Sequence, residues 1–312
     1  ISLLFGRTGS TTLAGIREGI AGLPAGDPIL MLAMGLLVVG FGFKVAAVPF
    51  HMWTPDVYEG SPTSVTAYMA VASKAASFAA FVRVFLEALG GIKESWRMLL
   101  VAVCVATMLL GNVVAIVQTN IKRMLAYSSI AHAGYALIGL VVADAAGVAS
   151  VMLYLAIYAF MNLGAFAVVT MLRRGGLEGD EIDDFTGLAR RNKWAAFVML
   201  LFMFSLAGIP PTAGFIAKFY VFMAAVGANM TGLAVIAVVF AAISAYFYLR
   251  VVMVMYMKEP GETAGTPGYD VRVVASPATI AVLLVAALGV IVLGVFPDPL
   301  IQAAQSAILP LK

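Results

Sequence analysis

Three lysines lie inside long apolar stretches of the sequence, where a charged side chain is expensive. Lys44 stands within Leu37–Phe50, Lys74 lies near the middle of its predicted helix, and Lys218 follows an interruption rich in proline. A charge near the bilayer centre costs at least about 2.5–3.5 kcal/mol on insertion scales, so such residues usually line an ion or proton path. Low dielectric also destabilises an ammonium relative to the neutral amine, which lets a buried lysine release a proton. The lysines are candidate proton carriers.

Snorkelling, in which the charged group reaches the headgroups along its apolar stem, is the alternative for such residues. It suits Arg83 and Arg250, which lie near predicted helix ends, better than Lys74, with roughly 15 Å of helix on each side. His132 stands in mid-span, and its imidazole could pass protons near neutral pH, the alternative being a hydrogen-bonded structural histidine. His51 lies beside an interface and is expected to be structural.

Two of the apolar stretches are interrupted by prolines, around 48–55 and 207–214. Proline removes a backbone donor and clashes with the preceding turn, so both helices should break. Broken helices in corresponding places of two halves point to the ion site of a transporter, although each alone could be a kink that serves packing. The prolines concerned are Pro49, Pro55, Pro210 and Pro211.

The acidic residues lie in loops or near the ends of the apolar stretches, away from the three lysines. Glu87 is four residues after Arg83 and is expected to pair with it. The lysines therefore lack a counter-charge within the predicted spans. Either the partner is upstream of Ile1 or on another subunit, or the lysines are neutral at rest.

The composition of the chain requires lipid as a solvent. Of 312 residues, 62% are hydrophobic and 11% charged, and the mean hydropathy is +1.02. Soluble domains are about half apolar and a quarter charged. The small net charge of +3 makes nucleic acid an improbable partner. The single cysteine, Cys104, lies in an apolar run, and the sequence contains no cysteine cluster, phosphate-binding glycine loop or HExxH metal motif.

A helix needs about 20 apolar residues to cross the hydrocarbon core. Because backbone in lipid must satisfy its own hydrogen bonds, each span should be helical. The sequence thus predicts an all-α, polytopic transmembrane helix bundle with two broken helices. The predicted spans are about 29–52, 62–89, 96–118, 123–143, 146–172, 193–225, 231–257 and 277–309.

Loop composition predicts the turns and the orientation. The segment 173–193 should be a solvated loop, and Gly261–Pro267 a turn. One set of alternate loops carries more lysine and arginine than the other, and positive loops stay cytoplasmic, so the C-terminus should face outward. Ile1–Gly6 is interpreted as the tail of a helix whose beginning is missing, and the chain as a fragment.

Four stretches resemble a known family. The segment 42–62, GFKVAAVPFHMWTPDVYEGSP, resembles the antiporter-like, proton-translocating subunits of NADH–quinone oxidoreductase, respiratory complex I. Its WTPDVY portion and ASKAA at 72–76 look like subunit N, as do AYSSIAH at 126–132 and AGIPPTAGFIAKF at 207–219. Subunit M typically has a glutamate where Lys218 stands. The resemblance covers nearly the whole chain.

The resemblance implies a fold of two inverted repeats of five helices, each with one broken helix. On that basis residues 1–90 form the C-terminal part of an incomplete first repeat. Residues 91–260 form the second repeat, and residues 261–312 a loop and the C-terminal transmembrane helix.

The same resemblance implies a proton channel driven by quinone reduction in other subunits. Lys44 and Lys74 would form the inner relay of the first half-channel, His132 would belong to the relay of the second repeat, and Lys218 would exchange protons with the outer side. Flavin, iron–sulfur clusters and quinone are expected in partner subunits and no cofactor in this chain. Expected partners are the other membrane subunits, including neighbouring antiporter-like subunits, in a bacterial inner membrane, with the C-terminus periplasmic.

Two alternatives remain open at this point. A subunit of a multi-subunit sodium/proton antiporter or of a membrane-bound hydrogenase would share the fold. A purely structural membrane scaffold would tolerate loss of all three lysines.

In the family that the chain resembles, the first of these lysines pairs with a glutamate two helices earlier, a position upstream of Ile1. Lys44 is therefore expected to face an interior polar cavity on the side where that helix would pack. A restored carboxylate should lie about 4–6 Å away, where an opposite charge changes the protonation of an amine.

Overall fold

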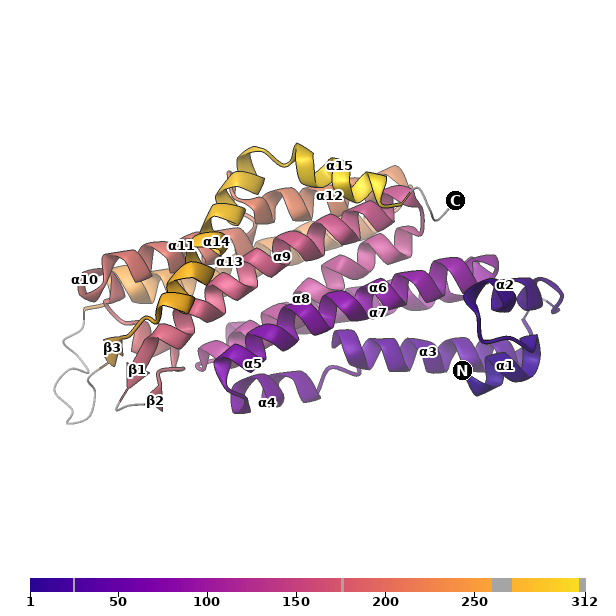
Figure 1. Ribbon diagram of the computed structural model, residues 1–312, viewed down its shortest axis with the longest axis horizontal. Helices are drawn as coiled ribbons and strands as arrows, with labels where there is room; N and C mark the ends of the chain where they lie inside the picture. Colours follow the sequence, from indigo (N-terminus) through magenta and orange to yellow (C-terminus); the bar gives the residue numbers. More distant parts are fainter. Residues whose placement is uncertain (25, 175–176, 260–270, 309–312) are drawn as a thin grey trace.

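The computed structural model describes residues 1–24, 26–174, 177–259 and 271–308. It is an elongated bundle of helices that lie mostly side by side (Figure 1). Within the described residues, seven helical segments are long and apolar enough to cross a membrane. They are Pro28–Val45, Thr63–Ala88, Gly90–Ile116, Ile121–Val142, Ala145–Met171, Thr231–Met257 and Pro277–Val295.

Two shorter apolar helices, α11 and α12, make up an eighth stretch that is broken in the middle. The α-helices are α1 (Ser2–Thr8), α2 (Leu13–Ala21), α3 (Pro28–Val45), α4 (Trp53–Gly60), α5 (Thr63–Tyr68), α6 (Lys74–Arg83), α7 (Lys93–Ile116), α8 (Ile121–Val142), α9 (Ala145–Met171), α10 (Leu188–Arg191), α11 (Lys193–Ala207), α12 (Ala213–Gly227), α13 (Thr231–Met257), α14 (Pro277–Val295) and α15 (Asp298–Ser306). Four short turns, η1 (Met69–Ser73), η2 (Val84–Ala88), η3 (Gly90–Ile92) and η4 (Ile182–Phe185), and strands β1 (Leu172–Arg174), β2 (Leu177–Glu178) and β3 (Val271–Val273) complete the described elements.

The outer surface of the bundle is apolar. On α14, Leu284, Val285 and Leu288 are each about 60% exposed, at 59%, 61% and 60%. Water would penalise such a surface, whereas lipid tails are as apolar as leucine. The chain is thus a multi-pass membrane protein, as its composition predicts.

The first break lies between α3 and α4. Helix α3 ends because Ala46 adopts the left-handed conformation (φ 64), and its amide returns to the last turn of α3. The indole N–H of Trp53 donates to the carbonyl of Phe43 at 2.9 Å. Pro49 lies in the break as predicted, but Pro55 lies in the first turn of α4. The prediction for Pro55 is wrong because the first turn of a helix needs no amide donor there.

The second break lies between α11 and α12, and both predicted prolines, Pro210 and Pro211, fall within it. Gly208, at φ 86, ends α11, and its amide donates to the carbonyls of Phe204 and Ser205. Helix α12 then starts at Ala213. The predicted interruption of this span is confirmed.

Helix α8 is the most enclosed of the predicted spans, with 94% of its central window buried. It packs against α7, α9, α4 and α12. Polar side chains on α8 are therefore held inside protein rather than in lipid, which is where intramembrane polar groups are tolerated.

The span predicted at 277–309 is too long. Helix α14 ends at Val295, and Phe296 and Pro297 separate it from α15. The predicted loop at 173–193 contains strands, and β1 pairs antiparallel with β2 and β3. The predicted turn at Gly261–Pro267 and the boundary at 260/261 lie outside the described residues.

The contact between α11 and α12 generates a stability prediction. A Cβ on Gly214 would occupy the place of the Ser205 backbone carbonyl, and the Gly214 amide donates to Ser205 Oγ at 3.0 Å. Gly214→Ala should therefore lower the free energy of unfolding in detergent micelles by about 1–3 kcal/mol, the usual penalty of overpacking.

Gly227→Ala on the same helix is the matched control, since nothing lies within 4 Å of its Cβ position. Equal effects of the two substitutions on denaturant unfolding would contradict the close approach at Gly214.

Candidate functional site

Lys74 is buried at the start of α6 and is turned towards α8. Its Nζ donates to the carbonyl of Ser129 at 2.6 Å and to Ser129 Oγ at 2.5 Å. The π-helical turn Met69–Ser73 comes immediately before it. Such turns add a residue to the helical repeat and recur at functional sites, because they re-aim the residues that follow.

His132 lies on α8, one turn beyond Ser129, and is 3% exposed. Its Nδ1 is 2.6 Å from the Tyr154 hydroxyl and its Nε2 is 3.0 Å from the Tyr248 hydroxyl. The hydroxyl of Tyr248 also forms a hydrogen bond with Ser128. Both ring nitrogens are thus bonded to groups that can donate or accept, so either neutral tautomer is accommodated.

Lys218 lies on α12 and reaches back across the break. Its Nζ donates to the carbonyls of Leu206 at 3.0 Å and Ala207 at 2.8 Å, the last carbonyls of α11. The C-terminus of a helix carries about half a negative charge, so it stabilises a cation placed there. The ammonium also lies 5.4 Å from the ring centroid of Tyr135, within reach of a cation–π contact.

These side chains lie on and around α8, and we call them the polar row. Helix α8 supplies four of its members. Ser128, His132 and Tyr135 follow one another at spacings of four and three residues, which places them on one face, and Ser129 is next to Ser128. The rings of His132 and Tyr135 are in contact, with their centroids 6.0 Å apart, and the Tyr135 ring is the one that the Lys218 ammonium contacts. The polar row consists of Lys74, Ser129, Ser128, Tyr248, His132, Tyr154, Tyr135 and Lys218.

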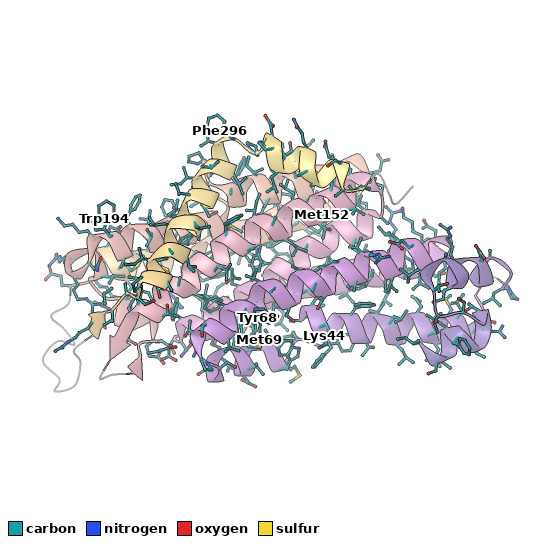
Figure 2. All side chains as sticks on the ribbon, in the orientation of Figure 1. Lys44, Tyr68, Met69, Met152, Trp194 and Phe296 are labelled. Atoms are coloured by element: carbon teal, nitrogen blue, oxygen red, sulfur yellow. The ribbon has the colours of Figure 1, made fainter. Side chains whose placement is uncertain are left out.

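Lys44 is not part of the polar row. It is exposed on α3 near the first break, and Figure 2 shows it at the end of that helix. The expectation that Lys44 faces an interior polar cavity is wrong for this chain. The physical reason is that α3 packs mainly against α1 and α6, which leaves its remaining face uncovered by the described residues.

Three further cations bind the ends of helices in the same way as Lys218. Arg250 donates to the carbonyl of Ile116 at 2.6 Å and to that of Gln118, beyond the end of α7. Lys93 lies 3.3 Å from two carbonyls at the end of α8, and Lys122 donates to the carbonyl of Ser61 at 2.9 Å. Snorkelling of Arg250 stays a prediction.

Other predictions concern smaller details of the spans. The pair between Arg83 and Glu87 forms at 2.9 Å, as predicted. His51 is buried in the first break. Asn112 donates to Met108 at 2.7 Å within its own helix and to the Tyr135 hydroxyl at 3.3 Å, across to α8.

No carboxylate forms an ion pair with Lys74 or Lys218 in the part of the chain that the structure describes. That part also contains no group of three or more metal-binding side chains. The buried acceptors Asn112 Oδ1 and Asn162 Oδ1 have no protein donor among the described residues. Buried polar atoms of this kind are usual partners of internal water.

Sequence reasoning found the histidine and two lysines of the polar row but missed its hydroxyl groups. The spacing of Ser128, Ser129, His132 and Tyr135 on one helical face was a usable signal. Tyr248 lies more than a hundred residues further along the chain, and no local pattern connects it to His132.

Comparisons with known proteins agree with the resemblance that the sequence motifs indicate. A sequence profile described as "NADH:quinone oxidoreductase/Mrp antiporter, TM" matches residues 1–244. The chain belongs to this family.

Several relatives and solved structures are similar over almost the whole chain. The chain is 52% identical over 307 residues to "NADH-quinone oxidoreductase subunit N 2" of Rhizobium meliloti (strain 1021), covering 98% of the chain and 62% of the relative. A protein of the same name from Solibacter usitatus (strain Ellin6076) is 44% identical, with 98% and 61% covered. The chain thus spans somewhat less than two thirds of the length of these relatives.

A chain of respiratory complex I from Thermus thermophilus superposes with a TM-score of 0.79 at 34% identity, covering 97% of this chain and 64% of the other. A chain of the Mrp complex from Dietzia sp. DQ12-45-1b has a TM-score of 0.83 at 23% identity, with 98% and 63% covered. The second match shows a shared fold.

The hydrogen bonds of Tyr248 allow a direct test of the polar row. Tyr248→Phe removes the hydroxyl that joins Ser128 to His132 and should lower the free energy of unfolding by about 0.6–1.7 kcal/mol, the range of interhelical hydrogen bonds in membranes. Denaturant titration in mixed micelles would measure it.

Tyr246→Phe is the control on the same helix, because Tyr246 is 56% exposed. Its effect should stay within about 0.5 kcal/mol, as for surface substitutions elsewhere. An unchanged stability of the Tyr248 variant would show that its bonds to α8 are not formed.

Proposed function

We propose that this chain is a proton-translocating membrane subunit of an NADH–quinone oxidoreductase and that the polar row is its proton path. The observation that carries the proposal is the burial of two lysines and one histidine around α8, each of them hydrogen-bonded to oxygen atoms of neighbouring residues. Relatives at 44–52% identity carry the name of subunit N of that enzyme.

The electrostatics of the polar row favour transfer of a proton between the two lysines over its retention on one of them. Two ammonium groups that share one low-dielectric interior disfavour each other, so protonation of one lysine promotes loss of the proton from the other. The partial charge at the C-terminus of α11 stabilises the ammonium of Lys218, whereas Lys74 has only the oxygens of Ser129. A proton should therefore move from Lys74 towards Lys218.

The intermediate steps are exchanges along hydrogen bonds. Lys74 releases its proton towards Ser129, and the neighbouring Ser128 and Tyr248 accept one proton and donate another in turn. His132 takes up a proton on one ring nitrogen and releases one from the other. Water held near Asn112 Oδ1 and the Tyr135 hydroxyl would complete the path to Lys218.

Lys44 stays a proposed proton carrier of this subunit, although it is exposed on α3 and lies outside the polar row. In the same proposal, residues 1–90 belong to the first repeat, 91–260 to the second, and 261–312 to a loop and the last helix.

The proposed function also implies the membrane and the partner subunits that surround this chain. The subunit would lie in the bacterial inner membrane with a periplasmic C-terminus, beside other antiporter-like membrane subunits. Flavin, iron–sulfur clusters and quinone would be bound by partner subunits.

A sodium/proton antiporter of the Mrp type is the second candidate function. The observation in its favour is the shared fold with a chain of the Mrp complex. Identification of co-purifying chains by mass spectrometry separates the two candidates, because iron–sulfur and flavin subunits accompany only a redox enzyme.

Substitution of the lysines tests the proton path in the complete complex. Lys74→Met or Lys218→Met keeps most of the side-chain volume but removes the titrating group. The complex should assemble, and the number of protons moved per quinone reduced should fall by the share of this subunit. Proton uptake by inverted vesicles, measured with an indicator dye during NADH oxidation, would report it.

Lys258→Met is the matched control, because Lys258 is 59% exposed and pairs with Asp183 at 3.4 Å outside the row. Lys→Arg at position 74 or 218 should not restore full pumping, since arginine stays protonated at any working pH. Wild-type pumping in the Lys218→Met complex would refute the assignment.

A further inference from the structure

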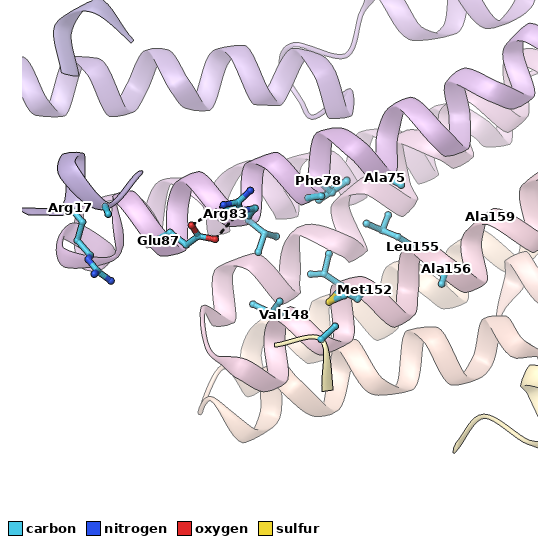
Figure 3. A pocket seen from close by; sticks show the side chains of 15 residues that line it. Arg17, Ala75, Phe78, Arg83, Glu87, Val148, Met152, Leu155, Ala156 and Ala159 are labelled. Atoms are coloured by element: carbon cyan, nitrogen blue, oxygen red, sulfur yellow. Dashed lines mark hydrogen bonds and ion pairs between the residues drawn. The ribbon is translucent and has the colours of Figure 1, made fainter. Parts of the chain in front are cut away.

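A cavity of about 950 Å³ lies between α6 and α9 (Figure 3). Four alanines line it from the two facing helices: Ala75 and Ala79 on α6, and Ala156 and Ala159 on α9. Side chains this small cannot fill the space between neighbouring helices. The result is an apolar groove that the described residues leave empty.

One end of the groove is charged. Arg17 from α2 and the pair Arg83 and Glu87 lie there, as Figure 3 shows. A second cavity of about 310 Å³ shares these three residues and adds Lys93 and Asp144. The apolar groove therefore opens into a polar chamber with one more cationic than anionic group.

The length and place of the groove match one leaflet of a bilayer. From Ala75 to Glu87 the helix rises about 18 Å at 1.5 Å per residue, close to the roughly 15 Å of one hydrocarbon leaflet. The charged end lies next to the connection at Gly90–Ile92 and to Asp144, which caps α9, so it lies at headgroup level. The inner end lies beside Lys74, near the middle of the membrane.

The cations of the polar chamber differ in their availability. Arg83 is paired with Glu87 at 2.9 Å, and Lys93 is directed at the carbonyls of Val142 and Ala143. Arg17 is exposed, and the structure records no hydrogen bond or ion pair for it with any described residue. A guanidinium in this position presents two parallel N–H donors, the arrangement that binds a phosphate.

We propose that this groove is a binding site for one anionic phospholipid, with its phosphate on Arg17 and an acyl chain along the four alanines. The one-leaflet length favours an acyl chain over a protein segment. A segment that ended at the midplane would leave backbone groups unsatisfied in an apolar environment, whereas an acyl chain ends there without cost. The proposal does not depend on the function proposed above.

Photocrosslinking in the intact membrane complex tests the site. A diazirine amino acid would be placed at Met152, which lines the groove on α9, or at Ala156 as a second position. The control position is Leu288, which is 60% exposed on the apolar outer surface of α14 and lines no part of the groove. The complex is reconstituted with equal amounts of phosphatidylglycerol and phosphatidylcholine, and the adducts are identified by mass spectrometry.

We expect the ratio of phosphatidylglycerol to phosphatidylcholine adducts at Met152 to exceed that at Leu288 about fivefold, which is about 1 kcal/mol for one arginine near an anionic lipid. Arg17→Gln should abolish this enrichment, and Lys193→Gln, at an exposed lysine of α11, should leave it unchanged.

Three results would overturn the proposal. Peptide adducts at both groove positions would mean that a protein segment fills the groove. Equal lipid ratios at the groove and at Leu288 would show that the groove does not select a headgroup. Enrichment that survives Arg17→Gln would remove the phosphate contact on which the proposal depends.

Discussion

The carbonyl groups at the end of a helix must find a donor when that end is buried in a membrane. In this chain cations meet the need repeatedly: Lys218 at the end of α11, Arg250 beyond the end of α7, and Lys93 at the end of α8. The arrangement stabilises both partners, because the carbonyls gain donors and the cation gains the negative end of a helix. It also answers how Lys218 persists here without a carboxylate, since the break after α11 is what exposes the carbonyls of Leu206 and Ala207 to it.

Helix α8 brings the buried lysines, the histidine and the hydroxyl groups close together. Its residues are almost all buried, so Ser129, His132 and Tyr135 are directed at neighbouring helices instead of lipid. Lys74 from α6, Tyr248 from α13 and Lys218 from α12 each reach a different turn of the same face. The two lysines differ in their stabilising groups: Lys74 bonds to oxygens of one serine, and Lys218 bonds to the end of a helix.

Membrane physics made much of the fold predictable. A span must be long, apolar and helical, and proline must break it, so the eight apolar stretches, the two breaks and the intramembrane position of Lys74, His132 and Lys218 could be read from local patterns. The errors share a cause. Pro55 and the split after Val295 depend on which part of a helix a residue occupies, and hydropathy carries no such information.

The sequence by itself determined that the chain crosses a membrane, where its helices break, and which titratable groups lie inside its spans, because these follow from the cost of charge and open backbone in lipid. Only the tertiary structure decided which of those groups meet. It separated exposed Lys44 from buried Lys74, placed Tyr248 on His132 across more than a hundred residues, and put the Lys218 ammonium on the end of α11. Hydrogen bonds act over about 3 Å, and only the packing of helices brings groups that are distant in sequence within that range.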